Sequence, residues 1–491
     1  MAEKLLVAGA GIAGLGVALA FGGTGHEVTL LDRDPEPPSD SLEDAFTSWE
    51  RRGATQLRHS HGFLGRLTVL LRDRHPALLE ELFANGVRAL DFQFGLPPGL
   101  REKYKPQPGD EDLKILFSRR TTMELVLRRH VQRFSNVRIV PDTGIHGVLT
   151  RRDGSALVAE GLKVEIGGEM QEMRADIVVD ASGRNSAFPD WLRAEGLDIR
   201  EETAPTGILY FTRHYKLLDG AEEPLRDATP LAADLGYIKY GVFMADNRHF
   251  SITLATPEIE SDLRTMIMRT EIFDAICQTL PGTARWVEQT RSEPVSPIYA
   301  MGNLQSVWRH YLKDGEPQVL DFFAVGDAAV RTNPLYGRGC SAGVVHAHVL
   351  REVLEANGDA RERAKVFDRR TRETLRPFYD TMARQDQQAI RRAHHQRNPA
   401  YKPGFRARMA KSFVEDGLVP AIRGDITVLR AFSRGFHMLD DPSNWLKRPE
   451  IIATILKFWR MPKAQKAERG YYPPPLGPSR GEMLTRLGIA A

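Results

Sequence analysis

Cysteine is scarce in this sequence. Cys277 and Cys340 are the only two cysteines in 491 residues. Two isolated thiols cannot form the disulfide framework of a small secreted domain or a zinc site built from cysteines. This composition is typical of a protein that works in a reducing compartment, and we expect a cytoplasmic location.

The sequence also lacks long apolar runs and an excess of charge of one sign. No stretch reaches the roughly 18 consecutive apolar residues that suggest a membrane-spanning helix, and the apolar N-terminus has no basic leader of the kind found in signal peptides. The 67 Lys and Arg residues stand against 64 Asp and Glu residues, so nucleic acid is not an expected partner. Pairs such as Arg51-Arg52 and Arg391-Arg392 are interpreted as solvated surface charges.

What the sequence does contain is a glycine-rich turn near its N-terminus. An apolar run at residues 4–8 is typical of a buried parallel strand, and it leads into Gly9, Gly11 and Gly14. In such a turn the first glycine permits a tight bend, the second lets a diphosphate approach the backbone, and the third lets helix and strand pack closely. The expected helix, with Ile12 and Ala13 in its first turn, directs free N–H groups toward that diphosphate.

An acidic residue follows the second strand of the same unit. Residues 27–31 form the expected strand, and Asp32 stands at its end, next to Arg33. A carboxylate at this position accepts hydrogen bonds from a ribose hydroxyl. Since strand, glycines, helix, strand and acid occur in this order within about 30 residues, the pattern predicts a dinucleotide site. By itself it does not distinguish FAD from NAD.

Two later segments repeat the pattern of an apolar strand followed by aspartate and glycine. Residues 175–184 contain Asp180 and Gly183, and residues 322–329 contain Gly326 and Asp327. The second segment continues into a glycine-rich loop and then a helical stretch that ends at Asn357-Gly358. The candidate site residues in and just after that loop are Pro334, Gly337, Gly339, Cys340 and Ser341.

Together with the N-terminal turn, these segments resemble the FAD-dependent monooxygenases of the p-hydroxybenzoate hydroxylase fold, over most of the first 360 residues. The resemblance implies an α/β fold with a Rossmann-like FAD-binding domain of the GR2 type, an inserted β-sheet substrate domain and a mainly helical C-terminal region. In this family the Gly-Asp pair binds the ribityl chain and diphosphate of FAD, which implies Gly326 and Asp327. The later loop passes beside the isoalloxazine ring, and Asp180 and Gly183 match a further family segment.

Two basic segments match the same family. Thr121 and Glu124 have the spacing of a capping box that starts a helix, and Arg120 takes the place of a family arginine that contacts FAD. A surface arginine beside a helix cap is the alternative. Arg58 and His59 belong to an Arg-His-Ser-His segment that resembles one in epoxidising members, which places them near the flavin, although a structural role fits the segment as well. No third ligand stands near its two histidines, so no metal site is expected.

The resemblance also divides the chain. The FAD-binding domain is expected to comprise residues 1–72, 110–200 and 300–360, the substrate-binding sheet residues 73–109 and 201–299, and the helical region residues 361–491. In that last region, residues 451–459 predict a helix packed on the protein, and the Pro-rich residues 472–475 predict an extended tail. The candidates for the substrate pocket, for each of which core packing is the simpler explanation, are Tyr210, Arg213, Tyr215, Tyr240 and Phe243.

The activity that the resemblance implies is a monooxygenase reaction. NADH or NADPH, directly or through a separate flavin reductase, reduces FAD, O2 adds at the flavin C4a, and one oxygen atom hydroxylates or epoxidises a small organic substrate, expected to be apolar or aromatic. No catalytic side chain is expected, because the cofactor carries the chemistry. Three alternatives stay open: a flavin-dependent halogenase, although its WxWxIP segment is not found here, an alkene reductase of the geranylgeranyl type, and a non-enzymatic flavin-binding protein.

Overall fold

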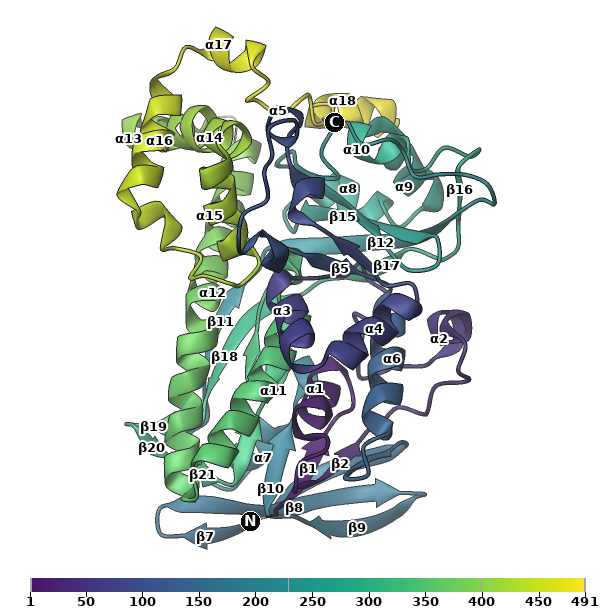
Figure 1. Ribbon diagram of the computed structural model, residues 1–491, viewed down its shortest axis with the longest axis vertical. Coiled ribbons are helices and arrows are strands. Elements are labelled where there is room, and N and C mark those ends of the chain that lie inside the picture. Colours follow the sequence, from purple (N-terminus) through teal and green to yellow (C-terminus); the bar gives the residue numbers. More distant parts are fainter. Residues whose placement is uncertain (1, 228, 399, 490–491) are drawn as a thin grey trace.

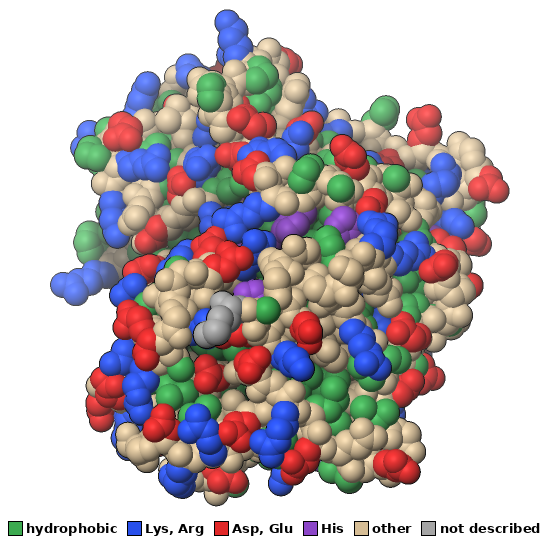
Figure 2. Space-filling view, turned by 60° about the horizontal axis from the view of Figure 1, so that its bottom comes forward, with side chains coloured by type: hydrophobic (Ala, Val, Ile, Leu, Met, Phe, Trp, Pro, Cys, Tyr) green, Lys and Arg blue, Asp and Glu red, His purple; other side chains and the backbone are tan. Residues whose placement is uncertain are grey.

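The computed structural model describes residues 2–227, 229–398 and 400–489. The expected fold class is confirmed: a parallel sheet lies in the lower half of the view in Figure 1, an antiparallel sheet lies in the upper half, and the long C-terminal helix α12 (Ala360–Arg397) runs beside them. Figure 2 shows positive and negative side chains interspersed over the face that it displays. No helix of the described residues is long and apolar enough to cross a membrane.

The parallel sheet contains the predicted N-terminal unit. In spatial order the strands are β22 (Phe322–Ala324), β10 (Ile177–Asp180), β1 (Lys4–Ala8), β2 (Glu27–Leu31) and β6 (Val137–Val140). Its strands pair in parallel throughout, and the side chains of β22, β10 and β1 are almost all buried, as expected for strands covered on both faces, whereas the edge strand β6 is partly exposed. The helices α1 (Ile12–Phe21) and α11 (Gly339–Ala356) pack with this sheet in one hydrophobic core.

The antiparallel sheet, here called the roof sheet, forms a second layer above the first domain. Its long central strand β12 (Ile208–Leu217) alternates between two environments, because successive side chains of a strand point to opposite faces. Phe211 and Tyr215 pack in a core with α9 (Thr270–Thr279), whereas Ile208 and Tyr210 belong to a different cluster. The other strands are β13 (Ala232–Asp234), β14 (Lys239–Met244), β15 (His249–Pro257), β16 (Ser292–Pro294) and β17 (Tyr299–Met301).

The segment at residues 73–109 does not belong wholly to the roof sheet as expected. Leu78 and Leu82 of α4 (Pro76–Ala84) pack in the core of the parallel sheet, because their i, i+4 spacing gives that helix an apolar stripe. The strand β4 (Arg88–Leu90) pairs with β5 (Ile115–Phe117), and only Leu90 and Phe94 pack against the roof-sheet core. The segment therefore bridges the two layers.

The C-terminal region is mainly helical, as expected. Its longest helix, α12 (Ala360–Arg397), runs along one side of the molecule (Figure 1), and α16 (Pro449–Arg460) packs on the protein through Ile451, Ile455 and Phe458. The Pro-rich residues 472–475 lie outside helices and strands, which fits the extended segment expected there, and the chain becomes helical again after Ser479. That residue caps α18 (Arg480–Arg486), whose Met483 and Leu484 are completely buried in the roof-sheet core.

The remaining strands form smaller sheets around the parallel sheet: β3 (Gly62–Phe63), β7 (Thr143–Asp153), β8 (Ala156–Ile166), β9 (Glu169–Arg174), β11 (Arg200–Pro205), β18 (Gln305–His310), β19 (Leu312–Lys313), β20 (Glu316–Pro317), β21 (Val319–Leu320) and β23 (Val330–Arg331). The further α-helices are α2 (Leu42–Ser48), α3 (Gly65–Arg74), α5 (Pro98–Arg101), α6 (Arg120–Gln132), α7 (Phe188–Ala194), α8 (Ser261–Met266), α10 (Pro281–Ala284), α13 (Phe405–Ser412), α14 (Val419–Gly424), α15 (Ile426–Phe436) and α17 (Lys463–Glu468).

Candidate functional site

One large cavity, of about 570 Å³, extends from the glycine-rich turn after β1 to the lower face of the roof sheet. It brings together residues that are more than 300 positions apart in the sequence. The predicted site residues that line it are Gly9, Gly11, Ile12, Ala13, Asp32, Arg33, His59, Arg120, Gly183, Tyr210, Tyr240, Phe243, Gly326, Asp327, Pro334, Gly337, Gly339 and Cys340. Those that do not line it are Gly14, Arg58, Asp180, Arg213, Tyr215 and Ser341.

The three glycines of the N-terminal turn have different surroundings. A Cβ atom on Gly9, whose φ is +99°, would lie 2.7 Å from the carbonyl oxygen of Ala181. A Cβ atom on Gly14 would lie 1.9 Å from the carbonyl oxygen of Gly9, so only glycine allows the helix to pack this close to the turn. A Cβ atom on Gly11 would meet only the guanidinium of Arg51, at 3.8 Å. Gly11 therefore leaves open space on the cavity side.

A buried arginine occupies the end of β2. Arg51 was expected on the surface, but its side chain is 2% exposed and its Nη1 donates to Asp32 Oδ2 at 2.5 Å. Its Nη2 also lies 3.4 Å from a carboxylate oxygen of Glu124, and its guanidinium lies over the ring of Trp49. The prediction for Arg51 was wrong because these partners come from three separate parts of the chain. Burial raises the pKa of Asp32, and the positive charge of Arg51 opposes that rise.

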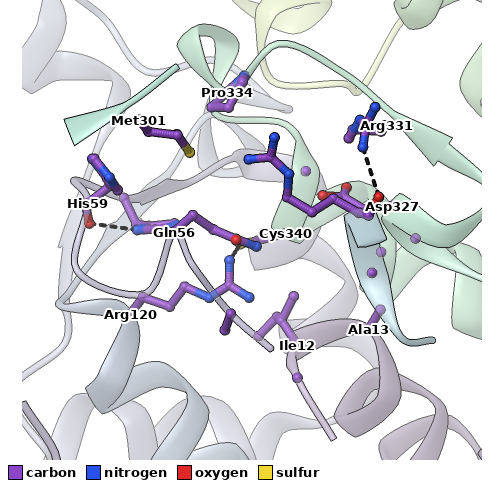
Figure 3. Close-up of a pocket in the computed structure, with 18 of the residues that line it drawn as sticks. Ile12, Ala13, Gln56, His59, Arg120, Met301, Asp327, Arg331, Pro334 and Cys340 are labelled. Carbon is purple, nitrogen blue, oxygen red and sulfur yellow. Dashed lines mark hydrogen bonds between the residues drawn. The ribbon is translucent and has the colours of Figure 1, made fainter. Parts of the chain in front are cut away.

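The predicted capping box at the start of α6 was also wrong. The helix begins at Arg120, one residue before Thr121, and its cap residue Arg119 forms no side-chain cap. Glu124 instead accepts a hydrogen bond from Arg120 Nε at 2.6 Å. The Nη1 atom of Arg120 reaches toward Cys340 Sγ, at 3.7 Å, across the floor of the cavity (Figure 3).

Of the two neighbouring arginines, Arg120 is the one at the cavity. Arg119 points away, and its guanidinium donates to carboxylate oxygens of Glu43 and Asp246. These bonds fasten α2 to the turn before β15, so Arg119 has a structural position. Arg120, at the start of α6, lines the cavity, and its contact with FAD stays a prediction.

Asp327 presents an unengaged carboxylate to the cavity. It follows β22 and lies opposite His59 and Gln56 in Figure 3. Neither of its oxygens accepts a hydrogen bond from another described residue. Burial raises the pKa of this carboxyl, while the charges of Arg120 and Arg331 lower it. An acceptor in such a place can receive hydrogen bonds from hydroxyl groups of a ligand.

The segment that contains His59 is joined to the roof sheet by a chain of hydroxyl groups. His59 Nδ1 lies 3.0 Å from Thr212 Oγ1, which is 2.8 Å from Thr253 Oγ1. Thr253 Oγ1 donates to Ser60 Oγ at 2.8 Å, and Ser60 Oγ lies 2.7 Å from Ser251 Oγ. His59, Ser60, Thr212 and Thr253 all line the cavity.

Both histidines of the segment face the cavity, but Arg58 does not. Arg58 donates to the carbonyl oxygens of Phe46 and Trp49, so its guanidinium is occupied within the protein. His61 Nδ1 donates to the carbonyl oxygen of His59 at 2.8 Å. Burial lowers the pKa of His59 to about 4 and that of His61 to about 3, so both imidazoles are neutral at physiological pH.

The roof sheet divides the predicted pocket residues between its faces. Tyr210 and Phe243 line the cavity; Tyr240 also borders it, but its side chain packs in the roof-sheet core on the opposite face, where its hydroxyl donates to the carbonyl oxygen of Pro230. Arg213 and Tyr215 lie on the opposite face of β12, where Arg213 Nη1 donates to Asp274 Oδ1 at 2.7 Å and the Tyr215 hydroxyl donates to the same oxygen at 3.2 Å. Their assignment to the pocket was wrong, since a strand with Tyr210 facing the cavity turns its odd-numbered residues away.

A second polar network anchors the loop that begins at Pro334. The Tyr210 hydroxyl donates to Asn333 Oδ1 at 2.5 Å, and Asn333 Nδ2 donates to Asp386 Oδ1 at 2.8 Å. The Tyr336 hydroxyl donates to the same oxygen of Asp386 at 3.1 Å. Asp386 comes from α12, so the C-terminal region holds the cavity loop in place.

Three other predicted residues shape the site from behind. Gly14 packs against the turn, as described above. Asp180 accepts hydrogen bonds from Ser182 N and from the hydroxyls of Ser182 and Ser186, and it thereby fixes the turn that exposes Gly183. Ser341 Oγ accepts a hydrogen bond from Leu64 N at 3.2 Å.

Sequence reasoning missed several cavity residues that come from short or irregular segments. The β5 strand and the loops around Met301 carry no motif, although alternation along β12 would have pointed to Thr212 once Tyr210 was chosen. Among the lining residues that sequence analysis missed are Gln56, Phe117, Arg184, Thr212, Lys239, Thr253, Met301, Leu304, Arg331 and Leu335.

Comparison with known proteins identifies the fold but not a close relative. No protein-family model matches the sequence, and no curated protein does. Among solved structures, the flavin-dependent brominase Bmp2 matches with a TM-score of 0.57 at 15% identity, over 92% of this chain and 99% of its own. PqsL, a probable FAD-dependent monooxygenase from Pseudomonas aeruginosa, matches with a TM-score of 0.51 at 16% identity, over 80% of this chain and 100% of its own. OxyS anhydrotetracycline hydroxylase from Streptomyces rimosus matches with a TM-score of 0.54 at 16% identity, over 90% of this chain and 76% of its own.

The fold family implies FAD, and the cavity suits it. The open space at Gly11 leaves room for a diphosphate beside the N-terminus of α1, the unengaged carboxylate of Asp327 can accept ribityl hydroxyls, and the glycines between Pro334 and Cys340 allow a flat ring to approach the backbone. The chain thus has the fold shared by FAD-dependent monooxygenases and flavin-dependent halogenases, the p-hydroxybenzoate hydroxylase fold.

Proposed function

We propose that this protein is an FAD-dependent monooxygenase that hydroxylates or epoxidises an apolar or aromatic organic molecule. The observation that carries the proposal is the single cavity that joins the glycine-rich turn and Asp327 to the lower face of the roof sheet. A cofactor held at the turn would extend toward the loop at Pro334 and leave space under the sheet for a second molecule. When bound and reduced, FAD supplies the activation of dioxygen.

The residues of the first domain hold and orient the cofactor in this proposal. The backbone at Gly9–Gly14 and the N-terminus of α1 receive the diphosphate. Asp327 accepts hydrogen bonds from the ribityl chain, and Arg120 places its positive charge beside the cavity loop. The 18-residue helix α11 begins at Gly339, so its N-terminal N–H groups face the same region and favour negative charge there.

The roof sheet and its neighbours keep water from the reacting region. The side chains that line this part of the cavity are mainly apolar: Phe117, Tyr210, Phe243, Met301, Leu304 and Leu335. Exclusion of water matters because water in the site favours release of the reduced oxygen as peroxide instead of its transfer to the substrate. His59 and His61 contribute neutral hydrogen-bonding groups, which suits an uncharged substrate.

A flavin-dependent halogenase is the second candidate. Structural similarity to the brominase Bmp2 over 92% of the chain favours it. The cavity also contains a lysine, Lys239 of β14, whose Nζ atom lies 3.1 Å from Asp234 Oδ2. That ammonium group is engaged by Asp234, and the WxWxIP segment of halogenases is not found in the sequence, so we favour oxygen transfer over halide chemistry.

The test compares the two reactions on one preparation. Purified protein is loaded with FAD and supplied with NADH or NADPH, with and without a flavin reductase, in the presence of O2, bromide and a panel of phenols and alkenes. Monooxygenation predicts products that contain one oxygen atom from isotopically labelled O2, together with substrate-dependent consumption of reductant. Brominated products would overturn the proposal in favour of the second candidate, and flavin that binds but is never reduced would favour a non-enzymatic role.

A further inference from the structure

The helix α13 (Phe405–Ser412) stands out because none of its residues is buried. Phe405 is 69% exposed, and Met409 is 39% exposed. Val414, just beyond the helix, is 45% exposed. Large exposed apolar side chains that lie singly on a surface are ordinary. Here Phe405 and Met409 stand one turn apart on the same helix face, so these two side chains form an exposed apolar stripe at an outer edge of the C-terminal region (Figure 1), whereas Val414 projects from another side.

The orientation of α13 is fixed by contacts at its C-terminal end. Trp459 Nε1, from α16, donates to Ser412 Oγ at 3.0 Å. The ring of Phe413 packs edge-on against the ring of Trp459, with centroids 5.5 Å apart. Phe405 and Met409 are four residues apart, so they lie one above the other on one helix face. The exposed stripe is therefore a defined feature of the surface.

Positive charge surrounds this stripe. The helix itself carries three basic residues, Arg406, Arg408 and Lys411, and no acidic one. Successive residues of an α-helix are rotated by about 100° around its axis. Arg406, which follows Phe405, and Arg408, which precedes Met409, therefore lie on the two sides of the stripe. Neither forms an ion pair with another described residue. Lys411 lies 3.8 Å from Glu415, the nearest acidic side chain on the adjoining turn.

An apolar stripe between basic side chains is the pattern by which a helix lies in the surface of an anionic membrane. The apolar side chains enter the boundary of the acyl chains while Lys and Arg contact lipid phosphates. A stable protein partner needs about 800 Å² on each side, which two apolar side chains on one short helix do not offer. Charge complementarity therefore favours a lipid surface over a protein partner.

We propose that α13, with Phe405, Met409, Arg406 and Arg408, is a reversible docking surface for anionic lipid bilayers. This inference rests on the exposed surface alone and does not depend on the proposed monooxygenase activity. It describes a helix that lies on a membrane, since no described helix can span one.

The experiment is co-sedimentation of the 491-residue protein with vesicles of phosphatidylcholine, either pure or containing phosphatidylglycerol. We expect about fivefold or greater binding to the anionic vesicles, reduced at high salt because the attraction is screened. The double variant Phe405→Ser/Met409→Ser and the double variant Arg406→Glu/Arg408→Glu should each remove most of this binding. Circular dichroism should show that both remain folded, because the substituted side chains are exposed.

Matched controls separate docking from general surface effects. Met170→Ser changes a 59% exposed methionine on β9, and Arg369→Glu changes an arginine on α12 whose side chain is 64% exposed. Both should bind anionic vesicles as the unchanged protein does. The proposal would be overturned if both α13 variants bound anionic vesicles as well as the unchanged protein does. It would also be overturned if the unchanged protein did not bind anionic vesicles.

Discussion

The Nδ1 atom of His59 lies 3.0 Å from the hydroxyl oxygen of Thr212, and this contact begins the hydroxyl chain that ties the cavity segment to the roof sheet. Thr253 is the central link, since it bonds both Thr212 and Ser60. Thr253→Val keeps the shape of the side chain but leaves two partner hydroxyls with one bond fewer. We expect a loss of about 1–3 kcal/mol in the free energy of unfolding, measured by urea denaturation.

The matched control for this variant is Thr265→Val. Thr265 is exposed on α8, and its hydroxyl donates only to backbone oxygens of its own helix. That substitution should change the free energy of unfolding by less than about 0.5 kcal/mol. If the two valine variants unfold at the same urea concentration, the hydroxyl chain does not fasten the segment.

Gly11 offers a test of the cofactor position that does not need activity. A side chain there meets only Arg51 at 3.8 Å, so Gly11→Val should fold normally while its methyl groups occupy the place proposed for the diphosphate. We expect FAD content after purification to fall by at least about tenfold, with the thermal midpoint unchanged when both proteins are compared without flavin. A folded Gly11→Val protein that keeps its yellow colour would contradict the placement.

The N-terminal unit could be predicted because its signals are local. The strand, the three glycines and the second strand lie within about 30 residues, and each glycine answers a nearby steric need. Arg51 could not be placed in this way. Its carboxylate partners, Asp32 and Glu124, come from β2 and α6, and nothing in the Arg51-Arg52 pair distinguishes a buried arginine from a solvated one.

The roof sheet illustrates a different limit. Any strand turns successive side chains to opposite faces, but which residues of β12 face the cavity depends on which side of the sheet meets the parallel-sheet domain. Tyr210 and Arg213 differ by an odd number of positions, so they cannot both face the cavity from a regular strand. The long-range partner Asp274 decides the outcome for Arg213.

Two buried arginines should therefore respond differently to removal. Arg120→Leu deletes a charge that lines the cavity, and we expect flavin affinity to fall about tenfold or more, since a hydrogen bond to a charged group contributes about 1.5–3 kcal/mol. Arg213→Leu deletes a charge on the far face of the roof sheet, and flavin affinity should stay within about twofold. Quenching of flavin fluorescence on titration with the apoprotein measures both. Equal losses would mean that the effect of Arg120 is structural.

Asp386 provides a prediction for the dependence of stability on pH. Burial raises the pKa of this carboxyl from 3.8 to about 6, against the hydrogen bonds that it accepts from Asn333 and Tyr336. The folded protein thus binds the proton more tightly than the unfolded chain. The stability contributed by the protonated group is complete below pH 3.8 and is lost as the pH rises through about 6.

Asp386→Asn removes this loss, because an amide can still accept the bonds from Asn333 and Tyr336 but does not ionise. Relative to the unchanged protein, the variant should gain up to about 3 kcal/mol in the free energy of unfolding between about pH 4 and about pH 7. Denaturant unfolding across that range measures the difference, and Asp380→Asn, on an exposed turn of the same helix α12, is the control that should show little change. A difference between the Asp386→Asn and unchanged proteins that stays constant over the range would show that the buried carboxyl is not ionising there.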